Sequence, residues 1–400
     1  MFPFLKKAHK KTTIAVFDIG SASVGGALIA FESGKKPKIL WSTRESMVFQ
    51  SDLNFGRFLS SMLETFEKVL ESLQKSGTEH PDDYLCVFSS PWYASQTRVV
   101  KMKRDKEFNV SKKGIDELIK KEIENFKLSH IEKYTRVGEE EVEIMEIRTI
   151  QMKLNGYTTD NPYGMPAKSL EMSLYISMAP DRVLKSVKAR IIKVFGDKNV
   201  TFGSFSLVAF STIRDVFSHR KDFLFMDISG EVTDISLVKG DVLLETVSFP
   251  HGKNFLVRRV ASGLNTVSEE AESLLTLYRE GRSSDVVKGK IDKILIEART
   301  QWLQFFREAL GSLSNDLSLP NMIFFTSDVD VSSWFRECMR SGDLGDFTGM
   351  GEPFEVVFLD SETMENFSIL SPQVPRDPFI MIEALFADRI IEERHITRAS

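Results

Sequence analysis

Hydrophobic residues dominate three short runs at the start of this chain, TIAVFDIG, SVGGALIAF and PKILWST, and polar turns separate these runs. Their β-branched residues and the intervening Gly- and Pro-containing turns predict three strands between 13 and 43. From 54 to 74 the apolar residues instead recur with a period near 3.6, which predicts an amphipathic helix. The run DYLCVFSSPWY predicts a further buried strand after that helix.

A different pattern occupies 95–178 and predicts an inserted α+β unit. A β-like TRVVKMKR precedes a helix predicted from 111 to 126, where SKKGIDE resembles an N-cap followed by an acid. The strand EEEVEIMEIRTIQMKL, the loop NGYTTDNPYGMP and the strand SLEMSLYISM come next. This β-α-β-β order can form a compact module.

The remaining pattern predicts a return to the first unit and then a second half. Helices are predicted at 180–194 and within TFGSFSLVAFSTIRDVF, a strand in FLFMDISG, and a hairpin that turns at Lys239-Gly240. Helical periodicity covers 254–306 with a break at YREGRSSD, and NMIFFTSDVD and EPFEVVFLD flank a helix in VSSWFRECMR. The last helix, 378–393, is predicted to fold back onto the first unit.

Length also favours several units, because 400 residues exceed what one hydrophobic core usually organises. The predicted segments are 1–11, a flexible basic tail; 12–94, the first part of the first unit; 95–178, the insertion; 179–220, the second part of the first unit; 221–375, the second half, helical at about 258–315; and 376–400, a C-terminal helix and tail.

Composition narrows the class of protein. A net charge of −5 gives no electrostatic footprint for nucleic acid. The two cysteines lie far apart, which indicates a reducing compartment such as the cytoplasm. No run reaches the ~18 apolar residues that a membrane span needs. We expect a cytoplasmic protein that reaches the inner face of the cell membrane only peripherally or through a partner.

Two similar bends, FDIGSASV and MDISGEVT, are the strongest chemical signal in the chain. The first carries Asp18, Gly20, Ser21 and Ser23, and the second carries Asp227, Ser229, Gly230 and Thr233. A Gly/Ser turn between strands exposes backbone N–H groups that can bind an anion. The acids Asp18 and Asp227 are suited to hold Mg²⁺ through water. Two such bends facing each other would clamp a polyphosphate.

DIGSASV and DISGEVTDI resemble the two phosphate hairpins of the actin-like ATPase superfamily. The stretch from NPYGM to LYIS is similar to the FtsA family of bacterial cell-division proteins, and the pilus-assembly protein PilM shares the architecture. The resemblance implies an α/β, actin-like (ribonuclease H-like) fold of two halves with an SHS2-type insertion in the 1C position. It also implies ATP and Mg²⁺ between the halves, with Gly252, Glu272, Thr326 and Ser327 as further binding residues.

The resemblance implies a role as a cell-division scaffold. Such a protein links FtsZ filaments to the membrane at the septum, recruits other division proteins and self-associates head to tail. The alternative is a PilM-like adaptor that binds a cytoplasmic peptide of an inner-membrane pilus protein. A third interpretation, a chaperone-like ATPase that closes on its ligand, is disfavoured by changes in the expected adenine loop.

Several positions depart from the family pattern. Ser229 replaces a glycine of the second hairpin, Lys253 replaces the second of two glycines, and Leu275 replaces a lysine. The expected T-G-G-G segment reads TSDV at 326–329, and we expect Asp328 to add negative charge beside the ligand. Either nucleotide binds weakly in a remodelled pocket, or the body is a nucleotide-free scaffold. Hydrolysis is expected to be weak at most, and no catalytic residue is assigned.

Two features concern partners. The basic cluster Arg98, Lys101, Lys103, Arg104 and Lys106 is either a solvated strand face or a binding patch for an acidic tail. The chain ends in IIEERHITRAS, without a basic, aromatic-bearing amphipathic helix. Either the sequence is shortened at this end, or membrane attachment is through a partner, or the N-terminal MFPFLKK makes the contact instead.

Overall fold

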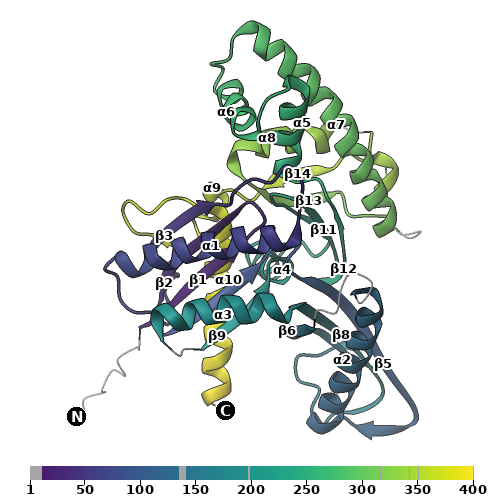
Figure 1. Ribbon diagram of the computed structural model, residues 1–400. Helices are drawn as coiled ribbons and strands as arrows, with labels where there is room; N and C mark the ends of the chain where they lie inside the picture. The colour runs from purple at the N-terminus through teal and green to yellow at the C-terminus, as the bar shows by residue number, and fades with distance from the viewer. Residues whose placement is uncertain are drawn as a thin grey trace.

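The computed structural model describes residues 11–134, 141–196, 199–314, 318–341, 343–349 and 351–399. These residues form two α/β halves, each built on one sheet, and a smaller unit inserted into the first half (Figure 1). The flexible tail predicted at 1–11 lies outside the described residues except for Lys11.

The first half is built on a six-stranded sheet in the order β15-β3-β2-β1-β4-β9. Its strands are β15 (Ile369–Leu370), β3 (Lys38–Ser46), β2 (Ser23–Phe31), β1 (Thr12–Ile19), β4 (Asp83–Phe88) and β9 (Val200–Ser204). Strands β1, β2 and β3 are antiparallel, whereas β1, β4 and β9 are parallel. The three strands predicted between 13 and 43 are confirmed as β1, β2 and β3.

Helices cover both faces of this sheet, which explains why β1 reads as a continuous apolar run. Ala15 and Phe17 pack with α1 (Phe55–Lys75) and α3 (Asp181–Phe195). Ile14 and Val16 pack on the other side with α4 (Phe205–Val216) and α10 (Pro378–Ala399). The amphipathic helix predicted at 54–74 is confirmed as α1, and the last helix returns to the first half as expected.

The second half is built on a five-stranded sheet in the order β12-β11-β10-β13-β14. Its strands are β12 (Val242–Phe249), β11 (Thr233–Lys239), β10 (Phe223–Ile228), β13 (Met322–Ser327) and β14 (Glu355–Phe358). One face joins the core that also holds α4 and α10, so the two halves share buried side chains. The hairpin turn predicted at Lys239-Gly240 is confirmed, with φ of 58° at Gly240 and 62° at Asp241.

Helices cover the other face of the second sheet and rise above it in Figure 1. They are α5 (Lys253–Leu264), α6 (Ser268–Arg279), α7 (Asp285–Ser314) and α8 (Val329–Ser341). The predicted break at YREGRSSD is the turn between α6 and α7. The hydropathy pattern did not predict four short elements, the turn η1 (Gly345–Phe347), helix α9 (Ser361–Met364), strand β15, and strand β7 (Tyr157–Thr158) in the expected loop of the insertion.

The insertion contains a four-stranded sheet in the order β5-β8-β6-β7 and one helix. Its elements are β5 (Ala94–Asn109), α2 (Lys112–Tyr134), β6 (Val142–Leu154), β7 (Tyr157–Thr158) and β8 (Pro166–Pro180). Glu146 of β6 anchors this sheet to the body by accepting a hydrogen bond from Ser204 N at 2.8 Å. The SHS2 assignment and the segment boundaries stay predictions.

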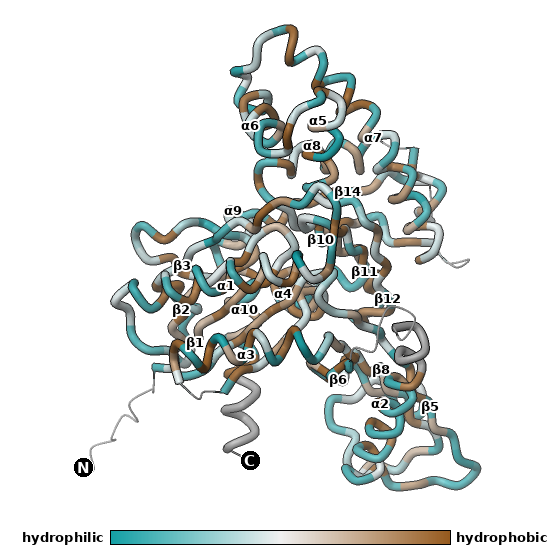
Figure 2. The backbone as a smooth tube through the Cα atoms, in the orientation of Figure 1, coloured by the Kyte–Doolittle hydropathy of each residue, from teal (hydrophilic) through white to brown (hydrophobic). Residues whose placement is uncertain are grey.

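Hydropathy follows this architecture (Figure 2), with apolar positions concentrated in the sheets and polar positions along the outer helices and the insertion. Within the described ranges, no helix is both long and apolar enough to cross a membrane. The same residues contain no group of three or more His, Cys, Asp or Glu side chains placed to hold a metal ion.

Candidate functional site between the two hairpins

The two predicted bends meet beside a cavity of ≈ 430 Å³ that is lined by residues of both halves of the molecule. The first bend joins β1 to β2 and the second joins β10 to β11, so each lies at the end of a buried strand. Of the predicted binding residues, Ser21, Ser23 and Glu272 line this cavity. The other nine predicted binding residues are not part of its lining, and the assignment of a nucleotide site stays a prediction.

The two hairpins contact each other directly. The Ser21 and Ser229 hydroxyl oxygens lie 2.9 Å apart, and Glu231 N donates to Ser21 Oγ at 2.9 Å. A Cβ placed on Gly230 would come within 2.4 Å of Ala22 Cβ, so the backbones approach as closely as a glycine allows. No phosphate-sized gap separates the tips of the hairpins.

Two backbone amides and one hydroxyl group of the predicted bends donate hydrogen bonds within the chain. Gly20 N donates to Ser23 O at 3.1 Å, and Ser229 N donates to Val232 O at 3.0 Å. The Thr233 hydroxyl donates to His251 O at 2.8 Å. A Cβ on Gly252 would lie 2.2 Å from Ser229 O, so the segment after β12 packs onto the second hairpin. These donors stabilise the chain itself instead of pointing toward an anion.

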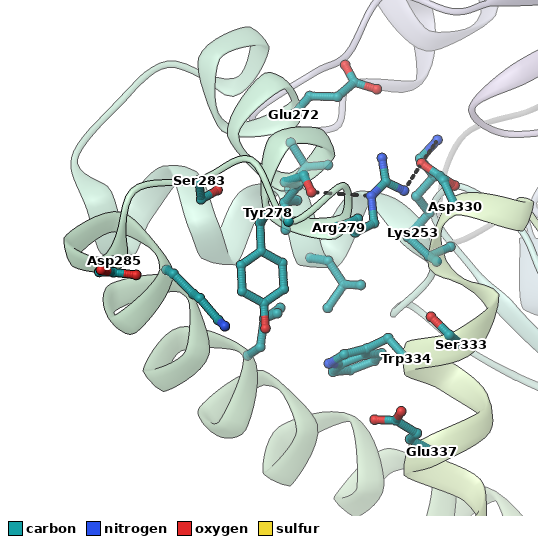
Figure 3. Close-up of a pocket in the computed structure, with 17 residues that line it drawn as sticks. Lys253, Glu272, Tyr278, Arg279, Ser283, Asp285, Asp330, Ser333, Trp334 and Glu337 are labelled. Carbon is teal, nitrogen blue, oxygen red and sulfur yellow. Dashed lines mark hydrogen bonds and ion pairs between the residues drawn. The ribbon is translucent and has the colours of Figure 1, made fainter.

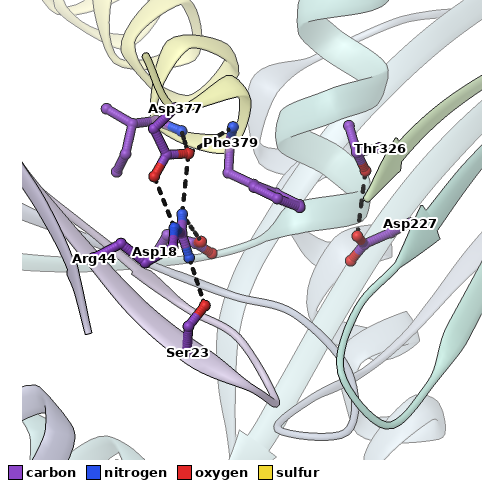
Figure 4. Close-up of polar contacts among 8 residues, drawn as sticks. Asp18, Ser23, Arg44, Asp227, Thr326, Asp377 and Phe379 are labelled. Atoms are coloured by element: carbon purple, nitrogen blue, oxygen red, sulfur yellow. Dashed lines mark hydrogen bonds and ion pairs between the residues drawn. The ribbon is translucent and has the colours of Figure 1, made fainter. Parts of the chain in front are cut away.

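An arginine neutralises the acid of the first bend (Figure 4). Arg44 Nη2 donates to Asp18 Oδ2 at 2.7 Å, and its Nε donates to Asp377 Oδ2 at 2.7 Å. Its Nη1 donates to the Ser23 hydroxyl at 2.9 Å. Burial raises the pKa of Asp18, Arg44 opposes that rise, and Asp377 adds to it. The guanidinium occupies the place beside Asp18 that a hydrated cation would need.

Arg44 was missed by the sequence analysis, although the double glycine in SVGGALIAF is a signal. Gly25 pairs with Arg44 across β2 and β3, and a Cβ at Gly25 would lie 2.8 Å from Arg44 Nη2. Glycine inside a strand often marks such a close approach. Gly26 likewise allows α1 to approach the sheet closely, because a Cβ at Gly26 would lie 2.4 Å from Val69 Cγ1.

The acid of the second bend is held by a threonine hydroxyl. Thr326 Oγ1 donates to Asp227 Oδ1 at 3.3 Å. Burial raises the pKa of Asp227 well above its usual range, and the nearby Asp234 and Asp18 carboxyl groups raise it further. The raised pKa makes this carboxyl group a weaker partner for a hydrated cation.

Two departures from the family pattern form one ion pair. Lys253 Nζ lies 2.9 Å from Asp328 Oδ2 and 3.3 Å from Asp330 Oδ2. Burial lowers the pKa of Lys253, but the two aspartates outweigh that effect and leave the pKa raised. The expectation that Asp328 adds net negative charge beside a ligand is therefore wrong, because Lys253 neutralises it. The Ser327 hydroxyl donates to Asp328 O at 3.1 Å.

A second buried pair closes the cleft from the other side. Arg258 of α5 donates to Glu231 through both terminal nitrogens, at 2.7 and 2.8 Å, and Asn254 Nδ2 donates to Glu231 at 2.7 Å. Arg258 Nη2 also donates to Gln50 O at 2.9 Å and so connects the second half to the first. Arg258 lies over the Phe49 ring at 5.0 Å.

The residues present do not fit ATP with Mg²⁺ in this arrangement. The phosphate hairpins touch, Asp18 is paired with Arg44, Asp227 carries a raised pKa, and the adenine-side loop is held by Lys253. Of these contacts, only the one between Ser21 and Ser229 joins the two halves, so a polyphosphate would have to separate the hairpins and also displace the ion pairs held within each half.

No protein-family model matches this chain, and no curated protein matches it. Solved structures do. The PilM-PilN type IV pilus biogenesis complex aligns over 95% of this chain and 98% of that chain, with a TM-score of 0.61 and 14% identity. The ethanolamine utilization protein EutJ from Carboxydothermus hydrogenoformans covers 94% of this chain and 90% of that chain, with a TM-score of 0.42 and 11% identity.

A further solved structure is a protein from Bacteroides thetaiotaomicron with an actin-like ATPase fold and unknown function, which covers 97% of this chain and 99% of that chain at a TM-score of 0.40 and 10% identity. The alignment with the PilM-PilN structure shows that the protein has the actin-like fold that the two hairpins predicted. Among these structures PilM has the highest TM-score, and the identity is low enough that it shows the fold alone.

Proposed function

We propose that this protein is a non-hydrolysing adaptor that uses an actin-like body to bind a cytoplasmic peptide of an inner-membrane pilus protein. The observation that carries the proposal is the pairing of the altered positions. Ser229 contacts Ser21 of the opposite hairpin, and Lys253 pairs with Asp328. Because the altered residues have gained partners within the chain, their pairing favours a cleft that the chain itself keeps closed. A nucleotide site that opens and closes is favoured less.

A groove between the insertion and the body supports the peptide-binding part of the proposal. This cavity of ≈ 260 Å³ is formed by β6 of the insertion with α4 and α10. Its apolar floor includes Leu207, Phe210 and Phe386, and three arginines, at 148, 214 and 389, line it. Acidic side chains are absent from its described lining. Apolar contacts with cationic surroundings suit an amphipathic segment that carries carboxylates.

The electrostatics at Arg214 agree with an acidic partner. Burial lowers the pKa of Arg214, and the neighbouring charge of Arg389 lowers it further. Asp215 lies 3.0 Å from Arg389 and 3.7 Å from Arg214, so it shares its charge between them. A carboxylate from a partner would relieve this repulsion. The PilM structure belongs to a complex with PilN, and we extend that mode of assembly to this chain.

The first test is calorimetry with ATP and Mg²⁺. We expect no saturable heat up to about 1 mM ligand, because the touching hairpins leave no space for a phosphate. A dissociation constant above about 1 mM would correspond to little binding free energy. Saturable binding that Gly20→Asp abolishes would place ATP at the first hairpin and contradict the closed-cleft proposal. The variant Ser229→Gly/Lys253→Gly/Asp328→Gly, which restores the expected glycines, tests whether the paired residues are what exclude the ligand.

The second test is affinity capture from a membrane extract with identification of the captured proteins. We expect an inner-membrane pilus protein, and loss of capture in Arg148→Glu. Lys101→Glu on β5 is the matched charge reversal outside the groove, and it should leave capture unchanged. If Lys101→Glu abolishes capture and Arg148→Glu does not, the partner binds the basic cluster on β5 and the groove assignment is wrong.

The FtsA-like alternative stays open on the NPYGM-to-LYIS motif. Capture of FtsZ or other division proteins in the same experiment would support that role and contradict the pilus adaptor. Head-to-tail self-association belongs to this alternative, and sedimentation at increasing protein concentration would detect it.

A further inference from the structure

A cavity of ≈ 490 Å³ among helices α5, α6, α7 and α8 adjoins the cleft between the hairpins (Figure 3). It shares Lys253, Glu272 and Asp330 with the lining of that cleft, so it belongs to the candidate site already described. A separate group of exposed side chains lies at the end of the insertion that points away from the body (Figure 1). We call this end, residues 106–113 and 155–169, the insertion tip.

The sequence motif NPYGM, which the proposed function does not use, forms a tight turn at the insertion tip. Met165 N donates to Pro162 O at 3.2 Å, and Gly164 has a φ of 76°, which the third position of a type II turn requires. Pro162 is buried, whereas Tyr163 and Met165 are 47% and 44% exposed. The turn therefore presents two large side chains to solvent.

Hydrogen bonds hold this turn in place. Gly164 N donates to Val110 O at 2.8 Å, and Val110 N donates to Met165 O at 3.1 Å, so the turn is joined to the segment that leads into α2. The Thr159 hydroxyl donates to Met165 Sδ at 3.9 Å and joins the turn to β7. Tyr157 of β7 is 80% exposed. Three exposed side chains thus lie close together on a hydrogen-bonded backbone, a grouping that indicates an interaction surface.

Lysines surround these exposed side chains. The insertion tip contains four lysines, at 106, 112, 113 and 168, and two acids, Glu107 and Asp160. Four positive and two negative charges give the tip a net charge of +2, whereas the whole chain carries −5. All four lysines are exposed, and within the described residues their one ion pair joins Lys113 to Glu117 at 4.0 Å. The tip therefore has the charge that an anionic surface attracts.

Tyrosine, methionine and lysine side chains together suit the boundary between water and lipid. A tyrosine ring is apolar and its hydroxyl group is polar, so tyrosine is enriched at the level of the lipid headgroups. A lysine side chain can lay its aliphatic stem along apolar surface while its ammonium group remains in water. Because the tip protrudes from the body (Figure 1), it can enter a headgroup layer without a partner of complementary shape.

We propose that the insertion tip binds a membrane surface that contains anionic lipids. Tyr157, Tyr163 and Met165 enter the headgroup layer, and the surrounding lysines contact the lipid phosphates. This contact needs no partner protein, so it is independent of the pilus-peptide proposal. It also differs from a contact made by the N-terminal MFPFLKK.

The test is co-sedimentation of the full chain with lipid vesicles. One set of vesicles contains phosphatidylcholine and phosphatidylglycerol in equal parts, and the other contains phosphatidylcholine alone. We expect binding to the anionic vesicles to be at least about 10-fold stronger, because each lysine near an anionic surface adds attraction. Absence of binding to the anionic vesicles, or equal binding to both sets, overturns the proposal.

Variants of the exposed aromatic residues place the contact at the insertion tip. Tyr157→Ser/Tyr163→Ser should weaken binding to anionic vesicles by about 10-fold or more, because it removes apolar area that enters the headgroup layer. Val267→Ser/Val286→Ser, which changes two exposed apolar residues of the second half, is the matched control and should leave binding unchanged. Unchanged far-UV circular dichroism shows that each variant is folded. Equal binding by the two double variants contradicts the assignment.

Charge reversal tests the electrostatic part. Lys112→Glu/Lys168→Glu should abolish the preference for anionic vesicles, whereas Lys290→Glu/Lys293→Glu, which reverses two exposed lysines of α7, should preserve it. The reverse result contradicts the proposal.

A chain that begins at Lys11 separates the tip from the N-terminal segment, and it should bind as the full chain does. If this truncation abolishes vesicle binding and the tip variants do not, the N-terminal segment makes the contact and the assignment is wrong. If the full chain does not bind vesicles but self-associates at increasing concentration, and Tyr157→Ser/Tyr163→Ser prevents this, the tip joins two copies of the chain and the membrane proposal is overturned.

Discussion

The two hairpins start from nearly the same local sequence and end in different electrostatic states. Both place an aspartate at the end of a buried strand, and Asp18 and Asp227 are each 2% exposed. Asp18 has a guanidinium partner at 2.7 Å, whereas Asp227 accepts a hydroxyl hydrogen bond at 3.3 Å and lies near Asp234. A strand–acid–turn motif therefore fixes the position of the acid, while partners from distant segments decide its charge.

The largest difference between the two bends should appear when Arg44, the partner of Asp18, is removed. Arg44→Met leaves Asp18 and Asp377 buried without their cation, and we expect the free energy of unfolding to fall by about 3–5 kcal/mol in urea denaturation. Arg376→Met, which removes an exposed arginine paired with Glu365, is the matched control and should change stability by less than about 1 kcal/mol. Equal effects would show that Arg44 is not the partner that neutralises the first bend.

Replacing each aspartate by asparagine tests directly whether the two bends differ in charge. Asp18→Asn weakens a charged hydrogen-bonded pair and should cost about 1.5–3 kcal/mol. Asp227→Asn replaces a carboxyl group whose charged form is disfavoured by burial and by neighbouring carboxyl groups, so we expect a smaller change, below about 1 kcal/mol at pH 7. Thermal unfolding of both variants side by side measures this, and a larger loss for Asp227→Asn would reverse the comparison.

A third carboxyl group, near the acid of the first bend, makes the stability of the protein depend on pH. Glu383 of α10 is fully buried, and its pKa is raised well above 4.5, first by burial and then by the charge of Asp18. Above pH 4.5 the unfolded chain releases this proton while the folded chain keeps it, so stability falls as pH rises toward the raised pKa. The slope is at most about 1.4 kcal/mol per pH unit for one proton.

Glu383→Gln removes the titrating carboxyl group and, with it, the pH dependence of stability that this group contributes. Relative to the variant, the unchanged protein should lose melting temperature as pH rises above about 4.5, because the folded chain keeps a proton that the unfolded chain releases. Parallel melting curves for the two proteins across this range would show that Glu383 is ionised in the folded state.

The smallest expected effect concerns the contact between the hairpins. Ser229→Ala removes one hydroxyl contact with Ser21 and should cost about 0.5–1.5 kcal/mol. Ser60→Ala removes an exposed hydroxyl of α1 that donates to Gly56 O, and it should cost less than about 0.5 kcal/mol. Indistinguishable denaturation midpoints for the two variants would mean that Ser229 does not hold the hairpins together.

Local patterns predicted most of the secondary structure, because hydrophobic period and turn chemistry act over a few residues. Periodicity correctly distinguished α1 from the strands around it and placed the helical break before Asp285. It failed for β15, a two-residue strand that exists only because it pairs with β3. A strand so short has no periodicity to detect, and its pairing partner lies more than 300 residues away in the chain.

From the sequence alone follow the two hairpins, each with its acid and Gly/Ser turn, and the positions where the family pattern is altered. What those alterations do depends on the tertiary structure. Arg44 reaches Asp18 through a gap that Gly25 leaves, and Lys253 meets Asp328 from an element 75 residues earlier in the chain. A charge acts through distance and burial, and folding alone brings these groups together in a buried cleft.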